Sequence, residues 1–319
     1  MTRFDASPGS RPRFVTPSGT LRTHLLEAAG GQAHARNLFP PVSSLYGTAQ
    51  HAGSVIDEAQ RMARSDDRLA PALVEVLRKV PLAVVFLDER QIIRPGEGTT
   101  VDELRAAARA MGRAHYHLEL KGSFRCNGSA ACTTWVDPLL SGNPTPWTGR
   151  HDYDLALSDD PFQLQQWTEQ ATVAGFCRRW TRTRPRDATG LPLDIAITVP
   201  STTTGPEQIW KAADPLTTHT GGHQQSGCIY SAQGLEYHHA GVIIGPDLTW
   251  TDGRWTAHPH HSRDPKLRHL TPDQYLPYAL NTYRVLLTLG THTTHHFLAR
   301  PIPPQPPTAK PQRRPSARP

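Results

Sequence analysis

The sequence predicts an α/β protein built on parallel sheets, because buried-strand patterns alternate with helical patterns along the chain. Two apolar runs, Val55-Ile56 and residues 82–87 (LAVVFL), each pass directly into a pair of acids. Apolar residues at helical spacing follow each run, over residues 69–77 and 101–111. Strands that end in polar residues and alternate with helices are typical of doubly wound sheets, which bind ligands at the carboxyl ends of their strands.

The other elements are predicted from the same patterns in chain order. Residues 13–26 favour a short strand followed by a helix, and the helix over 101–111 begins at a capping box of Thr100 and Glu103. Residues 115–120 (HYHLEL) alternate as a strand does, and the second half of 162–180 has helical spacing. Later β-rich runs cover 193–199, 227–230 and 241–244, and a helix over 275–289 precedes a strand near 295–298.

Composition and charge limit the class of protein. The 319 residues suffice for two domains, and no apolar run approaches the roughly 18 residues that span a bilayer. The N-terminus lacks a signal peptide's apolar core, and the four cysteines match no common zinc or disulfide spacing, so we expect a cytoplasmic protein. A formal charge of +6 suits DNA or RNA, but much of it lies in the Pro-rich residues 301–319. We therefore expect weak, salt-sensitive binding to which this tail contributes.

The first candidate site residues are Asp57 and Glu58, which follow the first buried strand. In a nucleotide hydrolase, the first acid of such a pair holds Mg²⁺ and the second activates the attacking water. The same two acids also suit an ordinary solvated helix start, so the pair alone favours neither interpretation.

Two further stretches place polar side chains after predicted strands. In residues 87–95 (LDERQIIRP), Gln91 stands where an amide of helicase-type ATPases contacts the γ-phosphate. In residues 120–127 (LKGSFRCN), Arg125 follows a strand, and its planar guanidinium suits phosphate oxygens. A surface turn and a surface ion pair are the alternatives, so each residue counts only in combination with the others.

The second half of the chain carries the most specific pattern. Residues 227–237 (GCIYSAQGLEY), closed by 242–247 (VIIGPD), resemble motif V of superfamily 1 helicases, and 281–288 (NTYRVLLT) resemble the start of motif VI. Together with the acidic pair and the Gln91 and Arg125 stretches, they occur in a fixed order. The chain resembles, over about residues 13–300, the bacterial ATPase family that shares the Schlafen group 3-like DNA/RNA helicase domain.

The resemblance implies two RecA-like P-loop NTPase lobes with parallel sheets, and ATP with Mg²⁺ between them. Lobe boundaries are expected at 13–134 and 161–300, with a linker over 135–160 and disorder over 1–12 and 301–319. Asp57 and Glu58 would serve metal and water, and Gln91 would sense the phosphate that Arg125 contacts. Gly234 and Glu236 would line the cleft from the second lobe, and Arg284 is a further candidate nucleotide contact.

Two departures from the family pattern predict a defective site. The family's phosphate-binding loop ends in Gly-Lys-Ser/Thr, but none of the five lysines here follows a glycine. Motif VI should read Thr-Arg-Gly, whereas this chain has Thr288-Leu289-Gly290. We expect a first lobe without its P-loop strand, an apolar edge beside the acidic strand and an inactive, truncated member.

Activity would then require a separate polypeptide that supplies the loop. The alternatives are a non-catalytic scaffold that binds nucleic acid or a protein partner, and a decayed product without a stable function.

Overall fold

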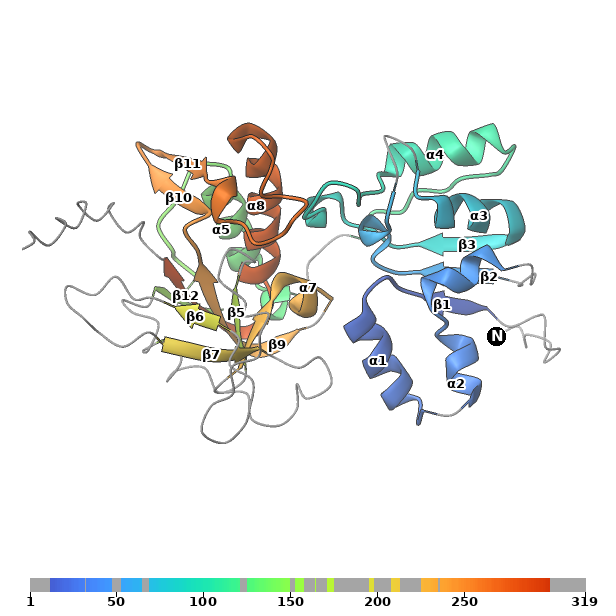
Figure 1. The fold of residues 1–319 in the computed structure, drawn as a ribbon, viewed down its shortest axis with the longest axis horizontal. Helices are drawn as coiled ribbons and strands as arrows, with labels where there is room; N and C mark the ends of the chain where they lie inside the picture. Colours follow the sequence, from blue (N-terminus) through green and yellow to red (C-terminus); the bar gives the residue numbers. More distant parts are fainter. Residues whose placement is uncertain are drawn as a thin grey trace, which may run out of the picture.

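The computed structural model describes residues 12–31, 33–47, 53–64, 69–120, 125–149, 153–157, 164, 171–174, 195–197, 208–212, 225–234 and 236–298. These residues form two α/β lobes, each around its own sheet (Figure 1). The elements of the first lobe are blue to cyan in Figure 1, and those of the second are green to red. The predictions of disorder over 1–12 and 301–319 fall, apart from residue 12, outside the described residues.

The first lobe contains a three-stranded parallel sheet in the order β1-β2-β3. Its strands are β1 (Arg13–Val15), β2 (Gly53–Ile56) and β3 (Leu82–Val85). Its helices are α1 (Gly19–Ala28), α2 (Ala33–Leu38), α3 (Pro71–Lys79) and α4 (Val101–Ala110), with short 3-10 turns η1 (Val42–Tyr46), η2 (Ala59–Arg61) and η3 (Glu89–Gln91). The expected capping box of Thr100 and Glu103 opens α4, where it satisfies two otherwise orphan N–H groups.

Alternation along β3 divides its side chains between the core and solvent. Ala83 and Val85 pack against the first-lobe core of Val15, Ile56 and Leu73. The alternate residues face away: Leu82 is 63% exposed and Val84 41%, and Phe86 just beyond the strand is 42% exposed. A run of six apolar residues is typical of an interior strand of a parallel sheet, yet β3 is at the edge of the described sheet.

The position of this edge corrects one expectation. An apolar edge is present, but it does not lie beside the acidic strand β2. Strand β2 is in the centre of the sheet, where β1 and β3 occupy both of its hydrogen-bonding edges. An additional strand would therefore have to pair with β1 or β3, and the exposed apolar side chains lie on β3.

The second lobe contains a seven-stranded sheet in the order β4-β12-β9-β5-β8-β7-β6. Every neighbouring pair is parallel except β6 with β7. The strands are β4 (Asp154–Leu157), β5 (Ala171–Ala174), β6 (Ile195–Ile197), β7 (Gln208–Ala212), β8 (Gln225–Cys228), β9 (Tyr237–Ile244) and β12 (Gly290–Leu298). A hairpin of β10 (Leu248–Thr251) and β11 (Arg254–Ala257) lies beside it, as do η4 (Arg125–Gly128), η6 (Pro259–His261), α5 (Ala130–Leu140), α7 (Ile229–Ala232) and α8 (Pro272–Leu287).

Three sequence expectations about local structure were wrong. The proposed linker 135–160 contains the end of α5, which packs in the second-lobe core, and β4, which pairs with β12. Residues 162–180 contain β5 rather than a helix in their described second half. Residues 115–120 form no strand, because no described strand pairs with them, and residues 116–120 are all exposed. In each case the structure of the segment depends on whether another part of the chain pairs or packs with it. The spacing of apolar residues within the segment does not contain that information.

Helix α8 anchors the second-lobe core. Tyr283 is fully buried, accepts a hydrogen bond from Gly245 N at 3.0 Å and donates to Asp247 Oδ1 at 2.6 Å. Tyr275 donates to the other carboxylate oxygen at 2.7 Å, so Asp247 is buried with partners on both oxygens. Among the described residues, no helix is both long and apolar enough to cross a membrane.

Candidate functional site

The acidic pair follows β2 at the carboxyl end of the first-lobe sheet. Backbone hydrogen bonds hold this turn between both neighbours, from Asp57 N to Val15 O at 2.9 Å and from Ala59 N to Phe86 O at 3.0 Å. Asp57 Oδ1 accepts from Glu58 N at 2.9 Å, and Glu58 Oε2 accepts from Gln60 Nε2 at 2.6 Å. Glu58 has φ 55°, a left-handed conformation that is strained for a residue with a side chain.

Burial raises the pKa of both acids. For Asp57 the cause is loss of water, opposed by the hydrogen bond from Glu58 N–H. For Glu58, burial and then the neighbouring Asp57 charge raise the pKa, while Arg61, Arg125 and Gln60 oppose the shift. A carboxylate with a raised pKa accepts a proton more readily, which is a property that a general base requires.

Gln91 and Arg125 meet in a cavity of about 350 Å³ between the lobes. Arg125 donates from Nη2 to Gln91 Oε1 at 3.2 Å and from Nη1 to Thr288 Oγ1 at 3.0 Å. It therefore bridges the η3 turn of the first lobe and the C-terminal end of α8. Gln91 Nε2 donates in turn to Asp88 Oδ2 at 2.9 Å, so its amide is held on both sides.

Arg284 lines the same cavity but is already held by an acid. Its Nε lies 3.0 Å from Asp137 Oδ1, and Arg90 Nη1 lies 2.9 Å from Asp137 Oδ2. Leu289, which stands where motif VI should have arginine, is 1% exposed and belongs to the second-lobe core. The position of the expected arginine finger therefore points into the protein and not into the cavity.

Gly234 brings the second lobe to the acidic pair, whereas Glu236 does not. Gly234 has φ +87°, and a Cβ there would lie 3.7 Å from Ser18 Oγ and 3.8 Å from Glu58 Oε1. A side chain at this position would be strained and would press on the acid. Glu236 is exposed, and no hydrogen bond or ion pair joins it to another described residue. Its role at the cleft stays a prediction.

Several residues that the sequence did not single out connect the lobes. Gln233 is fully buried and donates from Nε2 to Gln91 O at 3.1 Å, while its own carbonyl accepts from Arg61 Nη1 at 3.4 Å. Asn281 Nδ2 donates to Ile92 O at 2.8 Å. Gln60, 1% exposed, accepts from Asp88 N at 3.3 Å and so ties the two acidic turns together. The amide beside the glycine of Ala-Gln-Gly was the one available signal for Gln233.

The structure thus gathers Asp57, Glu58, Gln91, Arg125 and Gly234 around one interlobe region, with Arg284 on the cavity wall. The roles expected of these residues remain predictions. The described residues hold no group of three or more His, Cys, Asp or Glu side chains that would ligate a metal. Any Mg²⁺ at Asp57 would need most of its ligands from water or a bound phosphate.

Comparisons with known proteins give two similar solved structures and one family. The chain aligns with the arterivirus nonstructural protein 10 helicase at 12% identity and a TM-score of 0.40, covering 91% of this chain and 53% of that one. It also aligns with the nsp10 helicase of PRRSV at 10% identity and a TM-score of 0.20, covering 90% and 48%. The chain spans about half the length of these helicases, and no curated protein sequence matches it. The family described as "Schlafen group 3, DNA/RNA helicase domain" matches residues 5–298, and the chain belongs to this family.

Proposed function

We propose that this chain is a helicase-type lobe pair that binds nucleic acid and does not hydrolyse ATP by itself. The observation that carries the proposal is the content of the interlobe site. Groups that would sense phosphate and activate water are gathered there, namely Gln91, Arg125 and the acidic pair. The groups that would hold a triphosphate in place are not among them.

Asp57 and Glu58 fit the part of an ATP site that binds the metal ion and accepts a proton. Asp57 would hold Mg²⁺, which supplies charge neutralisation at phosphate oxygens when bound. Glu58 lies next to it with a raised pKa, and it accepts from Gln60, which fixes its orientation. This chain's own contribution is therefore a positioned acid pair with a proton-accepting side chain.

The residues present do not fit the part of an ATP site that binds the triphosphate. A phosphate-binding loop offers a row of backbone N–H groups and a lysine, but the sequence has no Gly-Lys pair. The second-lobe arginine is also missing, since Leu289 is buried and Arg284 is paired with Asp137. Catalysis of phosphoryl transfer depends on positioning and charge stabilisation, so no hydrolytic step is assigned to this chain.

A separate polypeptide that carries a Gly-Lys-Ser/Thr loop would supply the missing triphosphate-binding groups. The sheet restricts where such a strand would join, because β2 is paired on both sides; of the two edge strands, β1 and β3, β3 carries the exposed apolar residues. The exposed Leu82, Val84 and Phe86 would be covered by it. The proposed partner would thus add a strand beside β3, the strand that leads into the turn with Asp88 and Gln91.

A non-catalytic scaffold is the alternative, and the direct links between the lobes favour it. Gln233, Asn281 and Arg125 each join one lobe to the other without a bound nucleotide. In nucleotide-driven lobe closure, the ligand supplies much of the contact between lobes. Here side chains already supply it, which suits a surface of fixed shape.

Phosphate release by purified 1–319, with and without an oligonucleotide, tests the proposal. The matched control is the Asp57→Asn, Glu58→Gln double variant, which removes both acids and keeps their shape. We expect the same background from both proteins, because neither positions the γ-phosphate. Turnover that disappears in the double variant would show that the site is complete and would overturn the proposal.

A further inference from the structure

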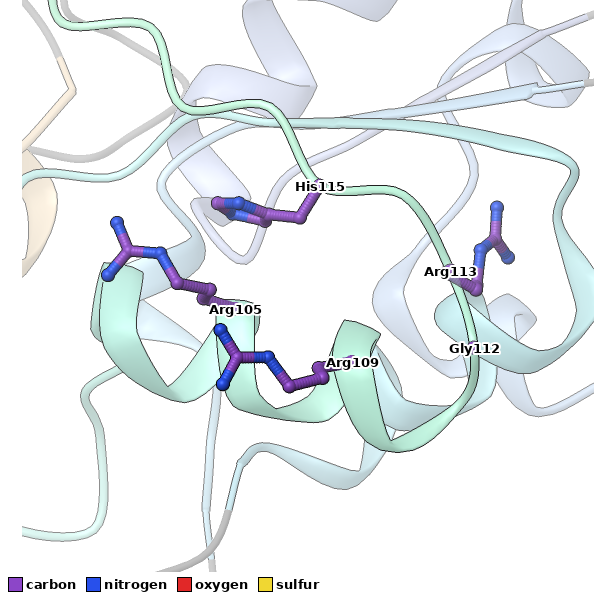
Figure 2. Close-up of a pocket in the computed structure, with 5 residues that line it drawn as sticks. All are labelled: Arg105, Arg109, Gly112, Arg113 and His115. Carbon is purple, nitrogen blue, oxygen red and sulfur yellow. The ribbon is translucent and has the colours of Figure 1, made fainter.

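A second cavity lies on the first lobe, away from the interlobe site, and its lining is basic. It measures about 420 Å³ and is lined by Arg105, Arg109, Gly112, Arg113 and His115 (Figure 2). No acidic residue lines it. Two guanidinium groups and an imidazole without a carboxylate in the wall indicate a place that attracts anions.

The local sequence explains how the cations come together. Arg105 and Arg109 are four residues apart on α4 and so lie on the same face of the helix. Gly112 has φ +66° and reverses the chain just after the helix, which returns His115 over that face. Arg113 donates to Leu77 O, Val80 O and Pro81 O at 2.5 to 2.6 Å, and this fixes the start of the returning segment.

The cavity's positive charge is only partly compensated. Arg105 contacts Asp102 at 2.5 Å, but Asp102 is 87% exposed, so water and salt screen this pair. Among the residues that the structure describes, neither Arg109 nor His115 has a hydrogen bond or ion pair. Figure 2 shows Arg105, Arg109 and His115 pointing toward one space, with the Arg113 guanidinium directed away from it. Like charges four residues apart destabilise a helix by a few tenths of a kcal/mol, and a bound anion would remove this repulsion.

The segment that returns over α4 carries an exposed aromatic residue next to His115 in the sequence. Tyr116 follows His115 and is 87% exposed, and Leu118 is 86% exposed. A free phosphate would have no use for an exposed aromatic ring next to its site in the chain. Single-stranded nucleic acid uses both features, because basic side chains follow its backbone while its bases stack on aromatic rings.

We propose that the Arg105, Arg109 and His115 cavity, together with the exposed Tyr116 that follows it in the chain, binds the backbone and a base of single-stranded nucleic acid. The inference rests on the proposed nucleic-acid binding and assigns it to a surface of the first lobe distinct from the interlobe site and from the tail. Arg105 and Arg109 contact phosphates, and Tyr116 stacks on a base.

Fluorescence anisotropy with labelled oligothymidylate and oligouridylate, without nucleotide, tests the site in the full chain. Arg105→Gln with Arg109→Gln should reduce the slope of log affinity against log salt by about 0.7 for each lost phosphate contact. Tyr116→Ala should weaken binding by roughly five- to a hundredfold, and Tyr116→Phe should retain most of the affinity because the ring remains.

The matched controls carry the same changes elsewhere on the exposed surface. Arg36→Gln with Arg254→Gln removes the same charge, and Tyr46→Ala removes an aromatic ring that is 53% exposed. Both controls should keep the wild-type slope and affinity. An equal loss in the controls would overturn the assignment, as would oligoglutamate that competes as well as an oligonucleotide.

The failure of the general proposal is a different result. It would appear as no oligonucleotide binding by the wild-type chain under low salt.

Discussion

Replacing Arg125 should loosen the contact between the lobes. Its guanidinium makes two hydrogen bonds, to Gln91 in the first lobe and Thr288 in the second. A hydrogen bond from a charged donor contributes about 1.5–3 kcal/mol, and the lower value applies here because the side chain lines an open cavity. Arg125→Ala should therefore lower the free energy of unfolding by about 3 kcal/mol. Arg125→Lys should recover less than half, since an ammonium on a single stem does not reproduce the planar fork.

Urea denaturation followed by tryptophan fluorescence measures this loss. The matched control is Arg90→Ala, because Arg90 lines the same cavity but forms only an exposed pair with Asp137. Such pairs contribute about 0–1 kcal/mol. An Arg125→Ala variant no less stable than Arg90→Ala would refute the bridging role. The same substitution removes a charge that lowers the pKa of Glu58, so that pKa should rise further in the variant.

Two more predictions concern stability and association. The apolar edge should cause concentration-dependent self-association, and Leu82→Lys with Val84→Lys should abolish it in sedimentation velocity, whereas Tyr46→Lys, which changes an exposed ring elsewhere, should not. His296 should make the second lobe acid-sensitive: burial lowers its pKa to about 4, and its enclosed Nδ1 has no hydrogen-bond partner among the described residues. Because the folded-state pKa lies below the unfolded value near 6.5, its contribution is fully present above that value. It is lost as pH falls toward 4, by up to about 3 kcal/mol; in urea denaturation, wild type should lose that stability relative to His296→Phe, and parallel pH curves would contradict this.

Elements with strong local signals could be predicted from the sequence. The buried runs that became β2 and β3, and the long apolar face of α8, each carry enough consecutive residues to indicate their type. Strands β4 and β5 were missed because they are short and pair with β12 and β9, which come much later in the chain. Their conformation depends on non-local hydrogen bonds, and a local pattern does not contain that information.

Some residues of the candidate site could likewise be predicted from the sequence, and others could not. Asp57, Gln91 and Arg125 follow predicted strands or occur in a recognisable order, so their convergence could be expected. Gln233 and Thr288 contribute through hydrogen bonds to distant residues, and for Gln233 the sequence offers only its place beside the glycine of Ala-Gln-Gly. Glu236 was assigned from motif order alone; it is exposed, and its role stays a prediction.

At Glu58, the left-handed backbone and the buried carboxyl lower the stability of the fold, while the same carboxyl is a candidate proton acceptor. Holding a residue with a side chain at φ 55° costs about 1–2 kcal/mol relative to glycine, and burial of its carboxyl adds a second unfavourable contribution. Glu58→Gly would remove both at once. A lineage selected only for a well-folded chain would therefore drift toward glycine here, which makes residue 58 the most informative position for deciding whether related chains still use their acidic pair.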